Sequence, residues 1–247
     1  MDHSGRERGL AVPSTPGSPE PFDEPLRYDD VERDAVIGHG GNATVHAASV
    51  RGSSDRVVAL KEPHVREPVP ETVHERFRRE AETWTRLDDH DHVVTVHGWA
   101  TDPHPWIAME YLDGGTLAGL VGDVDPARAL WTGATVAAAV SAAHGDDVVH
   151  GDLTPSNVLL STAGSDAWAV PKVADWGMAR VERAGTVNLE GLSPRYAAPE
   201  QFDPDRYGPP GAATDVYQLG VVLYELLVGS VPFEGPPRVL RDAVLGE

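Results

Sequence analysis

The sequence contains no cysteine, so disulfide bridges, thiolate metal sites and cysteine nucleophiles are excluded. Lysine is almost as rare, because only Lys61 and Lys172 occur among the 20 basic residues and the rest are arginines. The longest apolar-rich run, residues 216–229, is shorter than the roughly 20 residues that a membrane helix needs. The first residues also lack the apolar core of a secretory signal peptide. We therefore expect a cytoplasmic protein without a membrane partner.

Acidic residues outnumber basic ones by 39 to 20, which gives a formal net charge of −19. A surface this acidic repels nucleic acid and anionic membranes, so we expect neither as a partner. The acid excess together with the near absence of lysine is explained by adaptation to an extreme-salt cytoplasm, and we predict a halophilic, haloarchaeal source. The 247 residues, 40% of them hydrophobic, suffice for one large domain or two lobes with a core.

The first part of the chain alternates strand-like runs with turns. Residues 1–27 are rich in proline, serine, glycine and charge, and we predict a disordered leader there. Strands are predicted on both sides of a glycine-rich turn within 34–50, and again at 56–63, 92–99 and 106–112. One helix is expected at 71–87, because apolar residues share one of its faces. That face consists of Phe77, Glu80, Ala81, Trp84 and Leu87.

The pattern becomes mainly helical after Gly114-Gly115. Asp125-Pro126 is a favourable helix start, and this helix is predicted to end near His144. Two short strands follow, around 158–160 and 172–174, and a helix capped by Thr214 is expected at 214–229. The predicted fold class is α+β with two lobes. An antiparallel β-sheet N-lobe with one helix (28–110) is joined by a hinge (110–115) to a mainly helical C-lobe (116–247).

Two features of the N-lobe point to phosphate binding. The glycine-rich turn that begins at Gly38 lies between two strands, where its backbone N–H groups could cover phosphates, although such a turn is also common without a ligand. Lys61 ends a strand in a chain that nearly lacks lysine, which indicates a role for a compact positive charge, such as contact with a phosphate. Glu80 lies on the apolar face of its helix and needs a cation, for which Lys61 is the candidate.

The stretch "VVHGDLTPSNVLL" places Asp152 and Asn157 in a polar loop between two apolar runs. A further carboxylate, Asp175, follows a strand in "VADWG". Mg²⁺ prefers hard oxygen ligands, with the remaining positions filled by phosphate and water. Asn157 and Asp175 are therefore candidate metal ligands, and Asp152 could accept a proton from an attacking hydroxyl group. Each residue alone is an ordinary turn residue, whereas the ordered set is hard to explain in that way.

Taken in order over about residues 30–235, these motifs resemble the eukaryotic-like (Hanks-type) Ser/Thr protein kinase domain. The resemblance rests on "VALK", "FRREA", "MEYLDGG", "HGDLTPSN", "DWG", "SPRYAAPEQF" and "TDVYQLGVVLYELLVGSVPF". It implies ATP- and Mg²⁺-dependent transfer of the γ-phosphoryl group to Ser or Thr hydroxyls of a protein substrate.

The resemblance also implies a role for individual residues. Asp152 would be the catalytic base, Asn157 and Asp175 would bind Mg²⁺, and Lys61, locked by Glu80, would hold the α- and β-phosphates. Asp215 would brace the catalytic loop, and His150 would stack on Trp176. The implied nucleotide site includes Ile37, Gly38, Gly40, Val45, Ala59 and Leu159, with Met109 as gatekeeper and Glu110 and Leu112 at the hinge.

Some positions depart from the family pattern. Gly151 replaces the usual Arg, which predicts activity that does not depend on loop phosphorylation, with Thr186 and Ser193 as candidate acceptors. Thr154 replaces a Lys that touches the transferred phosphate. The chain ends at Glu247, so we expect a shortened C-lobe whose central helix exposes apolar surface. A truncated gene, a fragment, and dimerisation through that surface all stay open as explanations.

Two alternatives to an active protein kinase remain. A pseudokinase, which binds nucleotide or acts as a scaffold, would fit Thr154 and the short C-lobe, but it does not explain why the full set of chemical residues is present. A small-molecule phosphotransferase would share "HGDL". The segments "RYAAPEQ" and "DVYQLG" argue against it, because they resemble the substrate platform and central helix of protein kinases.

Overall fold

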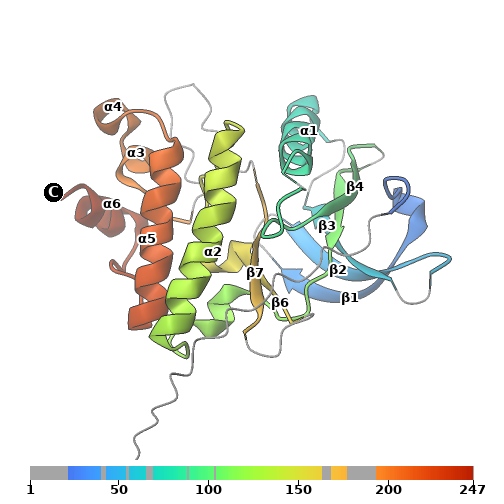
Figure 1. The fold of residues 1–247 in the computed structure, drawn as a ribbon. Coiled ribbons are helices and arrows are strands. Elements are labelled where there is room, and N and C mark those ends of the chain that lie inside the picture. The colour runs from blue at the N-terminus through green and yellow to red at the C-terminus, as the bar shows by residue number, and fades with distance from the viewer. Residues whose placement is uncertain are drawn as a thin grey trace, which may run out of the picture.

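The computed structural model describes residues 22–39, 43–53, 56–64, 69–87, 89–102, 104–162, 168–176 and 193–246. Two lobes are visible in Figure 1, and the predicted α+β fold class is confirmed. The N-lobe contains η1 (Tyr28–Asp30), β1 (Val31–His39), β2 (Ala43–Val50), β3 (Val57–Pro63), α1 (Glu71–Thr85), β4 (Val96–Ala100) and β5 (Trp106–Glu110). The C-lobe contains η2 (Leu117–Leu120), α2 (Pro126–Gly145), η3 (Pro155–Asn157), β6 (Val158–Ser161), β7 (Val170–Val173), α3 (Pro199–Phe202), α4 (Pro204–Tyr207), α5 (Ala212–Val228) and α6 (Pro237–Leu245).

The N-lobe sheet is antiparallel, with the strand order β1-β2-β3-β5-β4. Successive side chains of a strand point to opposite faces, and β3 follows this rule. Val58 and Leu60 pack in the outer cluster of the N-lobe, whereas Ala59 belongs to the large core that continues into the C-lobe. Lys61 lies two residues after Ala59, so both side chains point to the same face of β3. The one lysine of β3 therefore faces the C-lobe side of the sheet.

The C-lobe is built around two long helices, α2 and α5, which lie side by side in Figure 1. Asp125 caps α2 by accepting hydrogen bonds from the N–H groups of Ala127 and Arg128 at 3.0 Å, and Pro126 follows the cap, as predicted. The helices approach closely at Gly133, where an added Cβ would lie 2.3 Å from Leu223 Cδ2. The two-stranded sheet β6–β7 lies between these helices and the N-lobe sheet.

The structure corrects two of the predictions. Residues 22–27, assigned to a disordered leader, pack on the N-lobe: Leu26 is buried and its N–H donates to His97 O at 2.8 Å. This contact requires Gly98, because a Cβ there would meet Leu26 O at 2.2 Å. Thr214 is not the cap of α5 but lies inside its first turn, where its Oγ1 accepts from Gly211 N at 3.0 Å. Residues 1–21 of the predicted leader lie outside the described part of the chain.

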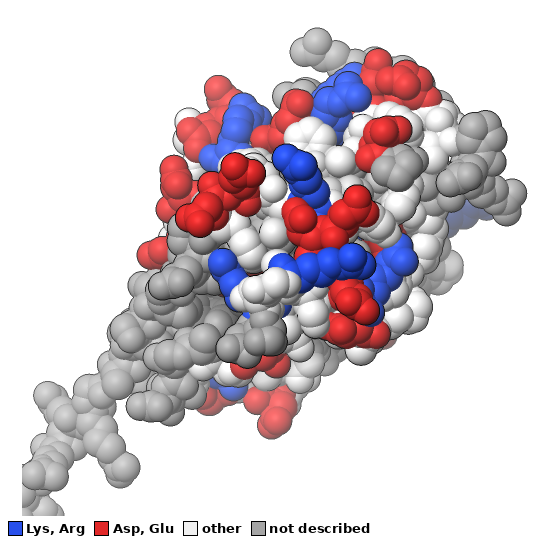
Figure 2. Space-filling model, turned by 90° about the vertical axis from the view of Figure 1, so that its right-hand side faces the viewer, with Lys and Arg blue, Asp and Glu red and all other residues white. Residues whose placement is uncertain are grey.

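The N-lobe side of the molecule carries charges of both signs. Figure 2 shows acidic and basic side chains interspersed on this face, so the excess of acid does not form one continuous patch there. Within the residues that the structure describes, no helix combines the length and the apolar character needed to cross a membrane.

Candidate active site

Lys61 and Asp175 form an ion pair where the two lobes meet. The distance from Lys61 Nζ to Asp175 Oδ1 is 2.7 Å, and both side chains are largely buried. Asp175 has a φ of 61°, in the left-handed region that residues other than glycine seldom adopt, although Asp and Asn tolerate it best. Such strain persists only where surrounding contacts impose it, and the bond to Lys61 is one of them.

The loop before β6 brings Asp152 and Asn157 together. Asn157 Nδ2 donates to the backbone oxygen of Asp152 at 2.8 Å, so the amide oxygen is the end that is left to bind a ligand. Ala174 N donates to Asn157 O at 2.9 Å, which places Asn157 beside the strand end that carries Asp175. These contacts gather four of the predicted site residues, Asp152, Asn157, Asp175 and Lys61, into one cluster.

The oxygen donors of this cluster fit a magnesium ion bound together with phosphates. Asn157 contributes an amide oxygen and Asp175 a carboxylate, and Mg²⁺ usually takes one or two protein oxygens while phosphate and water complete its octahedron. Within the described residues, no group of three or more His, Cys, Asp or Glu side chains could hold a metal by itself.

A fully buried carboxylate holds the catalytic loop in place. Asp215, on α5, accepts hydrogen bonds from His150 N at 2.9 Å and Gly151 N at 2.6 Å. His144 Nε2 contacts the same carboxylate at 2.7 Å. The predicted brace from the central helix is thereby confirmed. Gly151 itself has a φ of 71°, where glycine is favoured over the arginine usual in the family.

Two buried glutamines that the sequence analysis missed complete this network. Gln201 Nε2 and Gln218 Nε2 both donate to Gly151 O, at 2.7 and 3.0 Å, and Leu153 N donates to Gln218 Oε1 at 2.8 Å. All three hydrogen bonds are buried, so the segment from Gly151 to Leu153 has little freedom to move. Because the partners lie about 50 or more residues apart, no local motif could have shown them.

The predicted contact between His150 and Trp176 is also confirmed. Their ring centroids lie 4.9 Å apart with a tilt of 58°, and both residues are buried. His150 contacts Ala174 O at 2.9 Å, which ties the catalytic loop to the segment before Asp175. The carboxylate of Glu200, on α3, accepts a hydrogen bond from Thr214 Oγ1 at 2.6 Å.

The residues predicted to surround adenine lie on both lobes around this cluster. Val45 is opposite Lys61 across β2 and β3, and Ala59 is opposite Met109 across β3 and β5. Leu159, on β6, bridges to Thr116 just after the hinge. Gly38 is opposite Val45 across β1 and β2, and Ile37 is exposed near the same end of β1.

Some predicted features stay untested. Gly40 and Thr186 lie outside the described residues. Glu80 lies half-buried on α1, whose apolar face is buried as predicted, and its pairing with Lys61 stays a prediction. Thr154 is buried at the start of η3.

The hinge contains a charge pair that the sequence did not predict. Lys172 Nζ lies 2.9 Å from Glu110 Oε1 and 2.8 Å from Oε2, and both side chains are buried. Glu110 is the last residue of β5, so this pair ties the hinge to β7.

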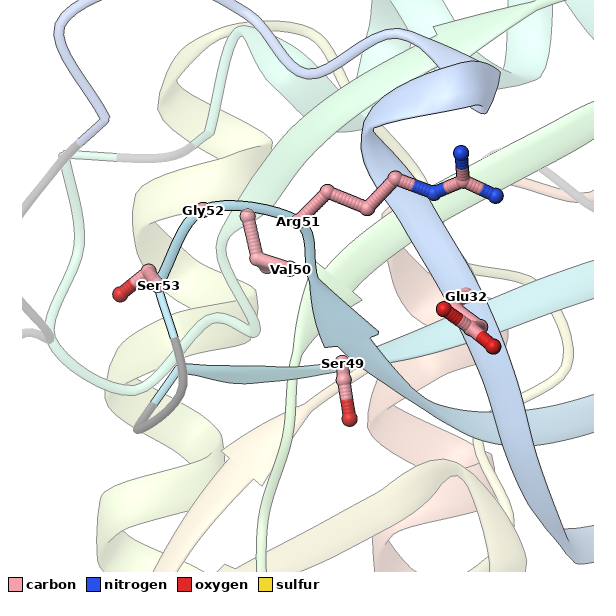
Figure 3. A pocket seen from close by; sticks show the side chains of 6 residues that line it. All are labelled: Glu32, Ser49, Val50, Arg51, Gly52 and Ser53. Carbon is pink, nitrogen blue, oxygen red and sulfur yellow. The ribbon is translucent and has the colours of Figure 1, made fainter.

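A hollow of about 450 Å³ lies elsewhere on the N-lobe, at the end of the β1 and β2 strands opposite the glycine-rich turn (Figure 3). It is lined by Glu32, Ser49, Val50, Arg51, Gly52 and Ser53. None of the clustered catalytic candidates lines it, so this hollow is separate from the candidate active site.

Burial raises the pKa of Asp152, the residue predicted to act as the base. The loss of solvent raises its pKa above the usual value, while hydrogen bonds from Ser193, including one from Ser193 N at 3.2 Å, oppose this shift. The charge on Asp175 adds to the increase. A general base is most effective when its pKa lies nearer the working pH.

The direction of this shift predicts the pH dependence of transfer. A carboxylate base acts in its ionised form, so with Asp152 in that role kcat/KM should fall as the pH drops through its raised pKa, at a higher pH than for an exposed aspartate. In Ser193→Ala the opposing side-chain hydrogen bond is lost, so the acid limb of the pH–rate profile should move to higher pH. If the wild type and Ser193→Ala lose activity at the same acidic pH, the assignment of Asp152 as the base is contradicted.

Comparison with known proteins agrees with this geometry. The family model described as a protein kinase domain matches residues 31–242. Serine/threonine-protein kinase PknL of Mycobacterium tuberculosis is 34% identical over 226 residues, which cover 89% of this chain and 54% of that protein. PknB of Mycobacterium leprae is 33% identical, covering 87% of this chain and 35% of that protein. The DNA damage-responsive serine/threonine-protein kinase RqkA of Deinococcus radiodurans is 35% identical, and the match covers 91% of this chain and 32% of that protein. The chain thus spans about half the length of PknL and about a third of the others.

Proposed function

This chain belongs to the protein kinase family, and on that premise we propose that it is an ATP- and Mg²⁺-dependent protein serine/threonine kinase. The observation that carries the proposal is the single cluster of Lys61, Asp152, Asn157 and Asp175 at the junction of the lobes. Similarity to serine/threonine-protein kinases over most of the chain supports the same activity. The acceptor would be a Ser or Thr hydroxyl of a protein.

Each residue of the cluster has a distinct task in this proposal. Lys61 binds the α- and β-phosphates, with Glu80 as its partner, and Asn157 and Asp175 hold Mg²⁺, which neutralises charge on the phosphates. Asp152 orients the attacking hydroxyl group and accepts its proton. Ala59, Val45, Leu159 and the hinge backbone hold adenine. Catalysis then depends on positioning and on charge neutralisation around the transferred group.

The proposal is tested by phosphate transfer from labelled ATP to a generic Ser/Thr protein substrate. In Asp175→Asn we expect transfer to fall by about 100-fold or more, because a carboxylate ligand of the metal is lost. Asparagine tolerates the left-handed backbone of this position, so the fold should be retained. The apparent affinity for Mg²⁺ should weaken, and added Mg²⁺ should restore part of the rate.

Asp146→Asn is the matched control, because Asp146 is exposed at the end of α2. It should transfer phosphate like the wild type. Transfer that is unchanged in Asp175→Asn would refute the metal site. A wild-type protein that binds ATP but labels neither itself nor the substrate would instead indicate a pseudokinase.

The surroundings of the protein form a second part of the proposal. A kinase draws on cytoplasmic ATP, which supports a cytoplasmic location for the catalytic domain. The formal charge of −19 supports the absence of a nucleic-acid partner and, with the rarity of lysine, adaptation of a halophile to concentrated salt. The transfer assay should therefore be run both in dilute KCl and in molar KCl. The rate should be higher in molar KCl, because the salt screens repulsion among the acidic side chains.

The outer face of α5 supports dimerisation. Val216, Tyr224 and Leu227 are 65%, 44% and 48% exposed along one side of the helix. The two charged residues of α5, Asp215 and Glu225, are both buried. A second copy could therefore cover this face without burying a charge of α5.

Light scattering after size-exclusion chromatography tests this dimer. The wild type should elute with twice the mass of the chain, and more fully so in molar KCl, which screens repulsion between two acidic copies. Leu227→Glu should be a monomer because it places a charge in the interface. Val36→Glu, at an exposed position of the N-lobe sheet, is the control and should leave the mass unchanged. A monomeric wild type in both salts would exclude the dimer.

A further inference from the structure

Both lysines of this chain lie where the two lobes meet, and each contacts a carboxylate there. Lys61 is paired with Asp175 at 2.7 Å, whereas Lys172 contacts both carboxylate oxygens of Glu110, at 2.8 and 2.9 Å. Every other basic residue, apart from histidine, is an arginine. Lys61 has a role in the proposed transfer of phosphate, but Lys172 has none among the tasks assigned above to the clustered residues.

Stability alone does not account for the Lys172–Glu110 pair. Lys172 is 1% exposed and Glu110 is 7% exposed, so both charges have lost nearly all contact with water. The attraction between two buried charges often only balances this loss, and an apolar pair of similar size can stabilise a protein as well or better. What the pair joins is therefore more informative than how strongly it binds.

The pair connects the hinge to the strand that leads into Asp175. Glu110 ends β5, directly after Met109 and before the hinge. Lys172 lies in β7, which runs into Asp175. The segment before β4 joins the same two elements, since Glu110 N donates to Thr95 O at 2.8 Å.

Backbone hydrogen bonds extend this connection on the β7 side. Val94 N donates to Val173 O at 3.0 Å, and Val173 N donates to His92 O at 2.8 Å. Thr95 N also donates to Glu110 Oε2 at 3.3 Å, so the carboxylate is held by the backbone as well as by Lys172. The hinge, the segment 92–95 and β7 thus form one buried brace.

We infer that Lys172 and Glu110 are positioning residues, which set the adenine-binding hinge in register with the metal-binding end of β7. The inference rests on the proposed function, because it concerns how one nucleotide is held at both ends. The hinge would contact adenine, and Asp175 would act through Mg²⁺ on the phosphates. A ligand that spans both ends gains the full affinity only if the two are held at the correct spacing, and a small misplacement is costly.

The test compares wild type with the double variant Lys172→Met/Glu110→Gln. This variant removes both charges, leaves no lone buried ion, and keeps an oxygen at position 110 for Thr95 N. The control is Arg33→Met/Glu62→Gln, which neutralises a close pair within the N-lobe sheet, at 2.6 Å, outside the proposed site. Calorimetry would measure the binding of Mg²⁺–ADP and of adenosine, and thermal unfolding would monitor the fold.

Misalignment should affect the ligand that spans both ends. In the double variant Lys172→Met/Glu110→Gln we expect Mg²⁺–ADP to bind about tenfold more weakly. The affinity for adenosine, which reaches only the hinge, should change by less than about twofold. KM for ATP should rise by about tenfold while kcat changes by less than about threefold, since the chemical residues are intact. The control variant should match the wild type in both affinities.

A purely structural pair would give a different result. Unfolding at a lower temperature with unchanged affinity for Mg²⁺–ADP would overturn the inference while leaving the proposed function intact. A wild type that binds no nucleotide would overturn both. If the double variant does not fold, Lys172→Arg replaces it: the larger, planar guanidinium keeps Glu110 paired but alters the spacing. An Mg²⁺–ADP affinity equal to that of the wild type in Lys172→Arg would equally refute the inference.

Discussion

Replacing Asp152 with asparagine should reduce phosphate transfer by about 1,000-fold, within the range by which general bases accelerate reactions. The asparagine oxygen can still accept the hydrogen bond from Ser193 N, and Asn157 Nδ2 still donates to the backbone oxygen of residue 152. The loop should therefore keep its shape. What is lost is the charge that we propose to orient the attacking hydroxyl and accept its proton.

Two measurements separate this loss from a loss of binding or folding. The affinity for Mg²⁺–ADP should change by less than about twofold, because Asp152 is not expected to hold the nucleotide. The midpoint of thermal unfolding should not fall, since removing a buried charge relieves desolvation at this position. Asp146→Asn serves again as the exposed control. Transfer by Asp152→Asn at a rate close to that of the wild type would show that another group is the base.

The second large effect is expected from Asp215→Asn. The buried carboxylate accepts hydrogen bonds from His150 N and Gly151 N and also contacts His144. An amide offers one oxygen and one NH₂ group, so at least one backbone N–H would face another donor. Bonds to a buried charged group contribute about 1.5–3 kcal/mol each, and we expect a loss of about 3 kcal/mol in the free energy of unfolding.

For a chain of this size, such a loss corresponds to a decrease of roughly 6–12 °C in the midpoint of thermal unfolding. Calorimetry would measure the decrease, and the transfer assay below this midpoint would measure activity. The activity of the folded protein should also fall, because Asp215 holds the backbone next to Asp152. Asp123→Asn, at an exposed position before α2, should change neither quantity. An unchanged midpoint for Asp215→Asn would mean that the loop is held by other contacts.

The parts of the fold that were predicted correctly depend on local patterns. Strand-like runs between turns indicated β3 and β5, apolar spacing indicated the buried face of α1, and Asp125-Pro126 indicated the start of α2. The candidate active site was predicted because Asp152, Asn157 and Asp175 occur in ordered motifs with distinct flanking residues. These features can be read within a window of a few residues.

The features that were missed depend on contacts between distant segments. The pairing of Lys172 with Glu110 spans 62 residues, and nothing near either residue identifies its partner. Gln201 and Gln218 look like ordinary helical residues in the sequence, yet both meet Gly151 O in the core. The short helices α3 and α4 were missed because four residues are too few to show a helical period. Residues 22–27 looked disordered by composition, although Leu26 finds a site beside Gly98.

The placement of the lysines has a consequence for covalent chemistry at amines. Side-chain ammonium groups are the targets of acetylation and ubiquitylation, and of most reagents that label amines. In this protein the Lys61 side chain is 13% exposed and the Lys172 side chain is 1% exposed, and both are engaged by carboxylates. Lysine-directed modification of this folded chain should therefore be confined to Lys61, in the proposed nucleotide site. Protection of Lys61 from an amine reagent by ATP would report occupancy of that site directly, without background from other lysines.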